Sequence, residues 1–323
     1  MTYARILGTG GFLPRRVVTN AELARTVDTS DEWIVSRTGI RERRIVASDE
    51  TSCDLAERAA RQALEAAGCL ATDIDLVIVA TTTPDRVFPS TACLLQDRLG
   101  IHGPAAFDVQ AVCTGFIYAI SIAEKFIKTG SAKRALVVGT ETMSRLVNWQ
   151  DRSTCVLFGD GAGAVILGAS AEPGILSAHL HADGAYKDLL TVTEDGADGT
   201  DRVLAAASGH IAMRGNEVFR VAVTTLDALV GETLAANGLN QSDIRWLVPH
   251  QANIRIISAT AKRLGMSMEQ VIVTVDRHGN TSGASIPLAL DVAVRDGRIQ
   301  RGDVVLMEGF GGGFTWGSVL FTY

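Results

Sequence analysis

Short apolar runs rich in β-branched residues recur along the chain, with helical segments between them. The clearest runs cover residues 76–80, 135–139 and 304–307. Continuous apolar strands are typical of a sheet that is buried on both faces, and their alternation with helices favours an α/β fold. We also expect a short strand with a glycine turn over residues 1–12.

The segment 52–67 has the pattern of an amphipathic helix. Thr51 and Asp54 have the spacing of a capping box at its start, and Gly68 stands where a helix would end. Between these signals an apolar residue recurs at every fourth position, which predicts one buried stripe. The stripe consists of Leu55, Ala59, Ala63 and Ala67.

The chain contains a weak internal repeat at a shift of 170 residues. In both halves a helix is followed by glycine, by Asp-Ile and by an apolar strand, and the constant offset predicts two copies of one βαβ-type unit. We place the two halves at residues 1–170 and 171–323. The matched segments are 64–68 with 234–238, 73–74 with 243–244, and Gly139 with Gly309.

The composition is that of a globular protein with one large or two medium domains. The 323 residues are 47% hydrophobic and 20% charged, and the formal net charge of −6 argues against general nucleic-acid binding. The N-terminus lacks the pattern of a signal peptide, and no apolar run approaches the roughly 18 residues of a membrane helix. We therefore expect a cytoplasmic protein without a membrane partner.

The five cysteines do not form a disulfide framework or a zinc site. Their number is odd, their spacing is scattered and no C-x-x-C pair occurs, so no metal is expected. Four of them are expected to be small buried hydrophobic residues. These four are Cys53, Cys69, Cys93 and Cys155.

Cys113 has chemically suggestive neighbours. It follows an apolar strand and precedes a helical segment over residues 116–128. A helix N-terminus would lower the pKa of the thiol, and its free N–H groups could hold an oxyanion. The alternative is a buried structural cysteine, which is the usual fate of a lone cysteine.

His250 and Asn280 also follow strand ends. Alone, His250 could be a core histidine and Asn280 a turn residue, while His278 lies in a polar turn and is expected to be exposed. In α/β folds, however, ligands bind at the carboxyl ends of strands, so Cys113, His250 and Asn280 can meet in one cleft. Cys-His-Asn is a known combination of a nucleophile and polarising groups, and it suits acyl-thioester chemistry.

A glycine-rich string covers residues 308–317, with four glycines among residues 309–313. A phosphate-binding loop is disfavoured because no Lys-Ser/Thr follows. The string favours a tight turn whose amide completes an oxyanion hole, with a β-bulge between the last two strands as the alternative.

Together these strings resemble the β-ketoacyl-[acyl-carrier-protein] synthase III family, the thiolase-like condensing enzymes that initiate bacterial type II fatty-acid synthesis. The resemblance implies a duplicated five-layered α-β-α-β-α fold, a homodimer and no permanently bound cofactor. It also implies a ping-pong reaction in which a short acyl-CoA and malonyl-acyl carrier protein give a β-ketoacyl product. The resemblance extends nearly end to end and rests on residues 29–34, 37–40, 112–116, 158–164, 250–253, 279–282 and 308–317.

The resemblance implies a role for each catalytic candidate. Cys113 is similar to the nucleophile that takes the acyl group from CoA. His250 and Asn280 are similar to the pair that binds the malonyl thioester carbonyl, where negative charge grows as CO₂ leaves. The amides of Cys113 and Gly312 would form the second oxyanion hole.

The resemblance also implies binding residues. Phe88 matches a loop residue that reaches the partner subunit's acyl pocket, and its bulk predicts an acetyl-sized primer. A basic stripe would dock the acidic carrier protein, although such charges are more often a solvated face. The CoA contacts would be Thr29, Trp33, Arg37, Arg152, Asn216 and Asn253, and the docking residues Arg220, Arg255, Lys262 and Arg263.

Four other functions are alternatives at this point. One is a related Cys-His-Asn condensing enzyme that makes a specialised β-keto product. A degradative thiolase and a hydroxymethylglutaryl-type synthase are disfavoured, because a second cysteine near the C-terminal glycines and a glutamate before Cys113 are lacking. A catalytically silent binding protein of the same fold is disfavoured by the intact Cys-His-Asn set.

Overall fold

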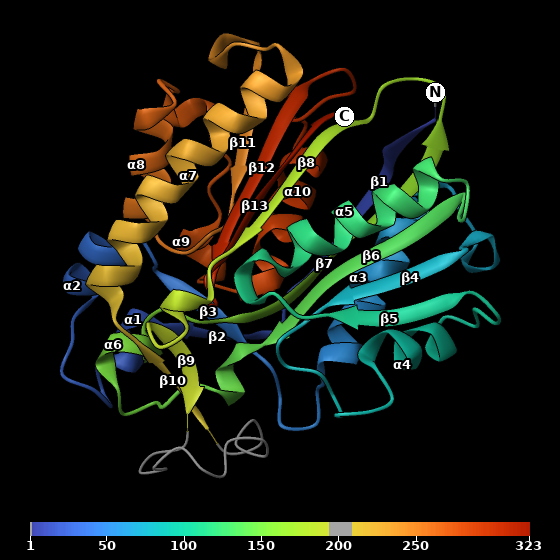
Figure 1. Cartoon of the computed structure of the whole chain (residues 1–323). Coiled ribbons are helices and arrows are strands. Elements are labelled where there is room, and N and C mark those ends of the chain that lie inside the picture. Colours follow the sequence, from blue (N-terminus) through green and yellow to red (C-terminus); the bar gives the residue numbers. More distant parts are fainter. Residues whose placement is uncertain (1, 194–208) are drawn as a thin grey trace.

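Two mixed β-sheets organise the chain, which is described over residues 2–193 and 209–323 by a computed structural model (Figure 1). The first sheet contains, in spatial order, β1 (Tyr3–Phe12), β7 (Asp160–Ser170), β6 (Arg134–Thr142), β4 (Leu76–Ala80) and β5 (Ala105–Val109). The second contains β11 (Trp246–Pro249), β12 (Val304–Gly311), β13 (Thr315–Thr322) and β8 (Ile175–Ala182). The predicted strands 76–80, 135–139 and 304–307 and the N-terminal strand are therefore confirmed.

Helices lie between the sheets and on both outer faces, which gives five layers. The central pair is α5 (Gly115–Lys128) and α10 (Ser285–Arg295), and one core cluster joins both helices to both sheets. The outer helices are α3 (Ser52–Ala67) and α4 (Thr91–Arg98) on the first sheet, and α7 (Gly215–Asn237) and α8 (Ile254–Arg263) on the second. Side chains alternate accordingly, since Ile78 packs toward the central helices and Val77 toward α3. The predicted thiolase-like α-β-α-β-α architecture is confirmed.

The repeat at a shift of 170 residues extends to whole elements. β4 and β11 begin at Leu76 and Trp246, and β6 and β12 begin at Arg134 and Val304. The short turns η2 (Val112–Thr114) and η8 (Ser282–Ala284) correspond in the same way, and the first residue of each has a φ of 48°. The turn that contains Cys113 therefore has the same place in the first half that η8 has in the second.

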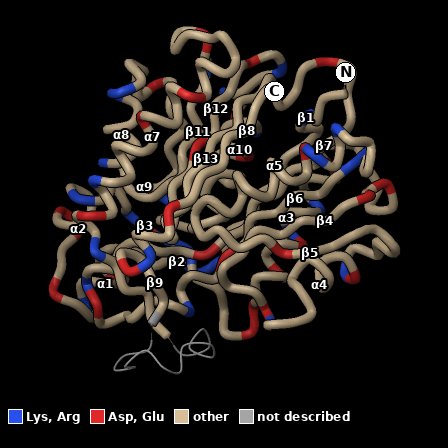
Figure 2. Tube along the Cα trace, viewed as in Figure 1, with Lys and Arg blue, Asp and Glu red and all other residues tan. Residues whose placement is uncertain are grey.

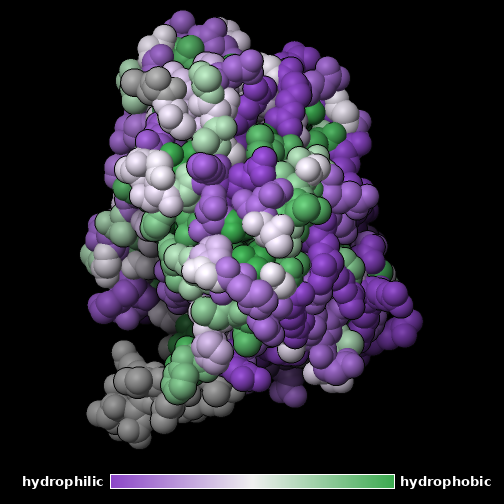
Figure 3. Space-filling view, turned by 90° about the vertical axis from the view of Figure 1, so that its right-hand side faces the viewer, coloured by the Kyte–Doolittle hydropathy of each residue, from purple (hydrophilic) through white to green (hydrophobic). Residues whose placement is uncertain are grey.

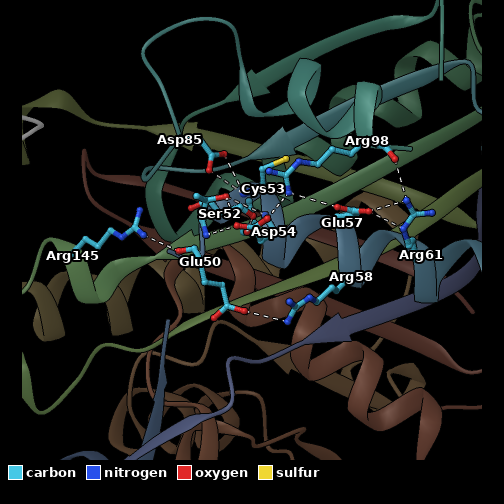
Figure 4. A network of polar contacts seen from close by, with 12 residues as sticks. Glu50, Ser52, Cys53, Asp54, Glu57, Arg58, Arg61, Asp85, Arg98 and Arg145 are labelled. Atoms are coloured by element: carbon cyan, nitrogen blue, oxygen red, sulfur yellow. Dashed lines mark hydrogen bonds and ion pairs between the residues drawn. The ribbon is translucent and has the colours of Figure 1, made fainter. Parts of the chain in front are cut away.

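Helix α3 has the ends that its sequence predicts. Thr51 and Asp54 form the capping box, and Gly68 ends the helix with a φ of 61°. The N-terminal end of α3 is tied to neighbouring segments (Figure 4). Asp54 pairs with Arg98 of α4 at 2.5 Å, and Asp85 accepts the N–H of Cys53 at 3.1 Å. The network thereby fixes the loop between β4 and α4.

Short elements enclose one end of the two sheets. Arg43 is fully buried among them, and it donates hydrogen bonds to the carbonyl oxygens of Val18 and Val156 and to the side chain of Asn20. These elements are β2 (Arg16–Thr19), α1 (Asn20–Leu23), α2 (Asp31–Thr38), β3 (Glu42–Ile45), α6 (Arg152–Cys155), β9 (Leu190–Thr193), β10 (His210–Met213) and α9 (Val275–His278).

Two expectations about buried residues are wrong. His278 is only 6% exposed, because α9 packs against β3 and Arg41 donates its N–H to the Asp276 carbonyl oxygen at 2.9 Å. Cys69 and Cys93 are half-buried, whereas Cys53 and Cys155 are buried as expected; these four and Cys113 are free thiols.

No helix among the described residues is both long and apolar enough to span a membrane.

Candidate active site

Cys113, His250 and Asn280 line one cavity of about 230 Å³. Cys113 comes from the turn before α5, His250 from the end of β11, and Asn280 from the turn after α9. The structure therefore brings together the three residues that the sequence singled out. The remaining wall includes residues of α2, β9, β10, the N-terminal half of α7, α8 and the end of β12.

The thiol of Cys113 is buried. Its Sγ lies 3.6 Å from the hydroxyl of Ser282, and the residue is 4% exposed. Burial raises the pKa of Cys113 to about 12, against the small lowering effect of the Ser282 hydrogen bond. The predicted position before a helix is confirmed, but the predicted lowered pKa is wrong, because desolvation of the thiolate outweighs the helix terminus.

His250 is fixed by its backbone and by its ring. Its N–H donates to the Glu308 carbonyl oxygen at 2.8 Å, and its Nδ1 lies 2.6 Å from Ser285 Oγ. Burial lowers the pKa of His250 to about 3, so the imidazole is neutral at neutral pH.

Asn280 is held on both sides of its turn. Its N–H donates to the Leu157 carbonyl oxygen at 2.8 Å, and its own carbonyl oxygen accepts from Gly159 at 3.0 Å. The side-chain Oδ1 accepts the N–H of Ser282 at 2.9 Å. Since Oδ1 is engaged, the Nδ2 group is the part of the amide that can donate to a ligand oxygen.

The C-terminal glycine string forms a tight turn beside Cys113. β12 and β13 pair without a register shift up to Gly311 and Thr315, so the turn itself consists of Gly312, Gly313 and Phe314, and no β-bulge is present there. A Cβ on Gly311 would lie 2.8 Å from the backbone nitrogen of Cys113, which explains the need for glycine. A Cβ on Gly312 would lie 3.5 Å from the Val112 side chain, so Gly312 also flanks the turn that contains Cys113.

The CoA candidates fall into two groups. Arg37, Asn216 and Asn253 line the cavity, whereas Thr29, Trp33 and Arg152 do not. Asn253 also caps α8, since its Oδ1 accepts the N–H groups of Arg255 and Ile256 at 3.0 Å.

Trp33 and Arg152 of the second group form an aromatic and cationic cluster with Arg37 of the first. The guanidinium groups of Arg37 and Arg152 lie 4.8 and 4.9 Å from the centroid of the Trp33 indole ring. Arg152 is tied to the loop before α2, because it donates to the Asp28 carbonyl oxygen at 2.8 Å. In the same loop, the buried Thr29 Oγ1 has no hydrogen-bond partner within the described part of the chain. A planar ligand group could stack on the indole and use this hydroxyl.

The four basic candidates lie on α7 and α8, interspersed with acidic residues (Figure 2). Arg255 lines the cavity, and Arg220 and Lys262 are exposed. Arg263 pairs with Asp227 at 2.7 Å, so its charge is partly neutralised. Phe88 does not line this cavity; it projects from the loop between β4 and α4 and is 83% exposed.

The sequence analysis missed three residues that belong to the site. Ser282 contacts Cys113 and Asn280, Ser285 contacts His250, and the buried Glu308 lines the cavity. Ser282 and Glu308 could have been indicated only by their places in the strings 279–282 and 308–317, and Ser285 lies outside both. Among the described residues no group of three His, Cys, Asp or Glu side chains could hold a metal ion.

Comparisons with known proteins identify the family of the chain. Residues 107–184 match the family model 3-oxoacyl-[acyl-carrier-protein] synthase III, and residues 234–323 match the model of its C-terminal part. The chain is 65% identical to a beta-ketoacyl-[acyl-carrier-protein] synthase III of Thioalkalivibrio sulfidiphilus and 63% identical to that of Thiobacillus denitrificans, in both cases over 100% of either chain.

Solved structures give the same result. A 3-oxoacyl-[acyl-carrier-protein] synthase III from Aquifex aeolicus has 47% sequence identity and a TM-score of 0.93, with 99% of this chain and 100% of that chain covered. The family resemblance drawn from the motifs is confirmed. The chain thus belongs to the 3-oxoacyl-[acyl-carrier-protein] synthase III family of acyltransferase-type condensing enzymes.

Proposed function

We propose that this enzyme condenses a short acyl-CoA, in the first place acetyl-CoA, with malonyl-acyl carrier protein. The products are β-ketoacyl-acyl carrier protein, CoA and CO₂, and the reaction would initiate fatty-acid synthesis. The observation that carries the proposal is the convergence of Cys113, His250 and Asn280 on one cavity. The names of its relatives support the carrier-protein product.

The first half-reaction transfers the acyl group to Cys113. The thiol attacks the thioester carbonyl, the bond to CoA sulfur breaks, and the proton of the thiol ends on CoA. Because the thiol is neutral in the resting site, attack and loss of its proton must be coupled. The amides of Cys113 and Gly312 are proposed to hold the oxyanion, and the close approach of Gly311 to the Cys113 backbone supports this arrangement.

The second half-reaction uses His250 and Asn280 as neutral donors. If the Ser285 hydroxyl donates to Nδ1, the proton of His250 lies on Nε2 and can point at the malonyl thioester oxygen. Asn280 Nδ2 supplies the second donor. Both interactions strengthen as negative charge develops on that oxygen during loss of CO₂, so they lower the barrier rather than merely bind substrate. The resulting carbon nucleophile attacks the acyl-Cys113 carbonyl.

Residues in and around the cavity are proposed to bind CoA and the carrier protein. Trp33 and Arg152 are proposed to enclose the adenine, with Arg37 near a phosphate and Thr29, Asn216 and Asn253 as polar contacts. Arg152 now lies on the Trp33 ring, so adenine would have to displace it. The residues proposed to dock the acidic carrier protein, an interaction that salt should weaken, are Arg220, Arg255, Lys262 and Arg263.

A cytoplasmic homodimer is the proposed form of the enzyme. β5 is an edge strand of the first sheet, and Val87 and Phe88 nearby are 95% and 83% exposed. Hydrophobic residues gather in the middle of the face on which α5, β5 and α4 lie (Figure 3). A second copy would cover these groups, and Phe88 could then limit the partner's acyl pocket.

The test is a product assay. Enzyme and acetyl-CoA are incubated with malonyl-acyl carrier protein or with malonyl-CoA, and products are identified by mass spectrometry. The proposal predicts acetoacetyl-acyl carrier protein from the first and little product from the second, with Cys113→Ser as the inactive control. Preference for malonyl-CoA, or a different β-keto product, would favour the specialised condensing enzyme instead.

A further inference from the structure

Glu308 is a buried carboxylic acid beside the three catalytic candidates. Its side chain lines the same cavity as Cys113, His250 and Asn280, and the residue is 1% exposed. Neither carboxyl oxygen has a hydrogen-bond partner within the described residues. A buried polar group of this kind is costly to the fold, so an unpartnered carboxyl that faces a reaction cavity requires an explanation.

Another buried carboxyl group shows what a structural role looks like. Glu141 is fully buried, but it accepts hydrogen bonds from the N–H and hydroxyl of Thr82 and from the hydroxyl of Thr83, at 2.7–3.0 Å. Its oxygens are therefore engaged in holding the loop after β4. Glu308 has no such contacts, so its carboxyl is available to a substrate or to a reacting group.

The protonation states in the cavity distinguish Glu308 from its neighbours. Burial raises the pKa of Glu308 to about 8, so the acid is mostly neutral at pH 7. The other titratable or charged side chains that line the cavity are Cys113, with a pKa near 12, His250, with a pKa near 3, and the cations Arg37 and Arg255. Glu308 is thus a proton-bearing acid in the cavity that can also release its proton near neutral pH.

We propose that Glu308 is the acid that returns a proton to Cys113 at the end of condensation. The inference rests on the proposed function. In that step the malonyl carbon forms a C–C bond to the acyl carbonyl, CO₂ leaves, and the C–S bond to Cys113 breaks with its electron pair on sulfur. The Glu308 proton goes to that sulfur, directly or through one water, and the carboxylate regains a proton from solvent.

Condensation needs this proton, whereas acyl transfer does not. In acyl transfer the proton only moves from one thiol to another. In condensation the electron pair left by CO₂ forms the C–C bond, and the pair of the broken C–S bond ends on the Cys113 sulfur, where it must be protonated. A thiolate at this buried position is a poor leaving group, because burial raises the pKa of Cys113. A positioned acid typically contributes about 10²- to 10⁴-fold to such a step.

The test measures the two half-reactions separately in wild type, Glu308→Gln and Glu308→Asp. Acetyl transfer to Cys113 is followed by intact mass. Isolated acetyl-enzyme is then mixed with malonyl-acyl carrier protein, and a single turnover is followed over a range of pH. We expect Glu308→Gln to acetylate within about threefold of wild type but to condense about 100-fold more slowly. Glu308→Asp should recover part of this loss, since it keeps the acid.

The pH profile and the folding control complete the test. Wild-type condensation should fall as pH rises through about 8, because Glu308 then loses its proton, and Glu308→Gln should lack this fall. The unfolding temperature of Glu308→Gln at pH 9 should equal or exceed that of wild type, since no charge is buried. Wild-type condensation rates in Glu308→Gln, or equal loss of both half-reactions in a folded variant, would overturn the inference. Failure of wild type to form acetyl-Cys113 would contradict the proposed function itself.

Discussion

At the scale of residues, one short segment holds all three catalytic candidates. Ser282 contributes its hydroxyl to Cys113 and its N–H to Asn280, and Ser285 contacts His250. The turn after Asn280 thereby contacts the Cys113 thiol, the His250 ring and the Asn280 amide together. The positions of the three side chains are coupled even though they come from distant parts of the chain.

Asn280→Ala should separate the two half-reactions. Removal of Nδ2 takes away one of two donors to the developing enolate, so condensation should fall about 100-fold or more. Acetyl transfer to Cys113 should remain within about threefold, because Asn280 is not assigned to that step. Both rates can be measured by quenched-flow mass spectrometry on the same preparation. An equal fall in both would refute the assigned roles.

The convergence of the three catalytic candidates on one cavity could be predicted from the sequence, but their protonation states could not. Local strings place Cys113, His250 and Asn280 at strand ends. The high pKa of Cys113, the low pKa of His250 and the burial of His278 depend on residues packed around them from elsewhere in the chain. Glu308 opens the glycine-rich string 308–317, but its burial arises from tertiary packing and could not be predicted from that string.

At the scale of elements, predictions succeed where local signals are strong. The ends of α3 agree with prediction because Thr51, Asp54 and Gly68 act within one turn. The stacking of Arg152 on Trp33 joins α6 to α2, and spacing alone could not place it. For the basic stripe the sequence pattern was insufficient, because it did not reveal that Arg263 pairs with Asp227 of α7.

β5 and the loop after β4 provide a test at this scale. Phe88→Asp should weaken self-association about tenfold or more, because a charge would replace an apolar anchor. Sedimentation velocity should show wild type at twice the chain mass of 34.2 kDa and the variant shifted toward the monomer. Leu70→Asp is the matched control, since Leu70 is 71% exposed and lies away from this loop. A monomeric wild type would exclude the proposed homodimer.

At the scale of the whole molecule, the duplication explains where the site lies. The offset of 170 residues could be predicted from a few identities, and it recurs in the strands and in the paired turns η2 and η8. We propose residues 1–170 and 171–323 as the two copies. Cys113 then belongs to the first copy, and His250, Asn280 and Glu308 belong to the second. The candidate active site therefore lies between the two proposed copies. The sequence could not show that η8 contacts the thiol directly.

The central claim is that Cys113 carries the acyl group between two substrates. The most direct test is the intact mass of the enzyme after incubation with acetyl-CoA, with peptide mapping, followed by addition of malonyl-acyl carrier protein. We predict one acetyl group on Cys113, which disappears as acetoacetyl-acyl carrier protein forms, and no acetyl group on Cys113→Ser. No mass gain, acetylation at another residue, or an acetyl group that malonyl-acyl carrier protein fails to remove would contradict it.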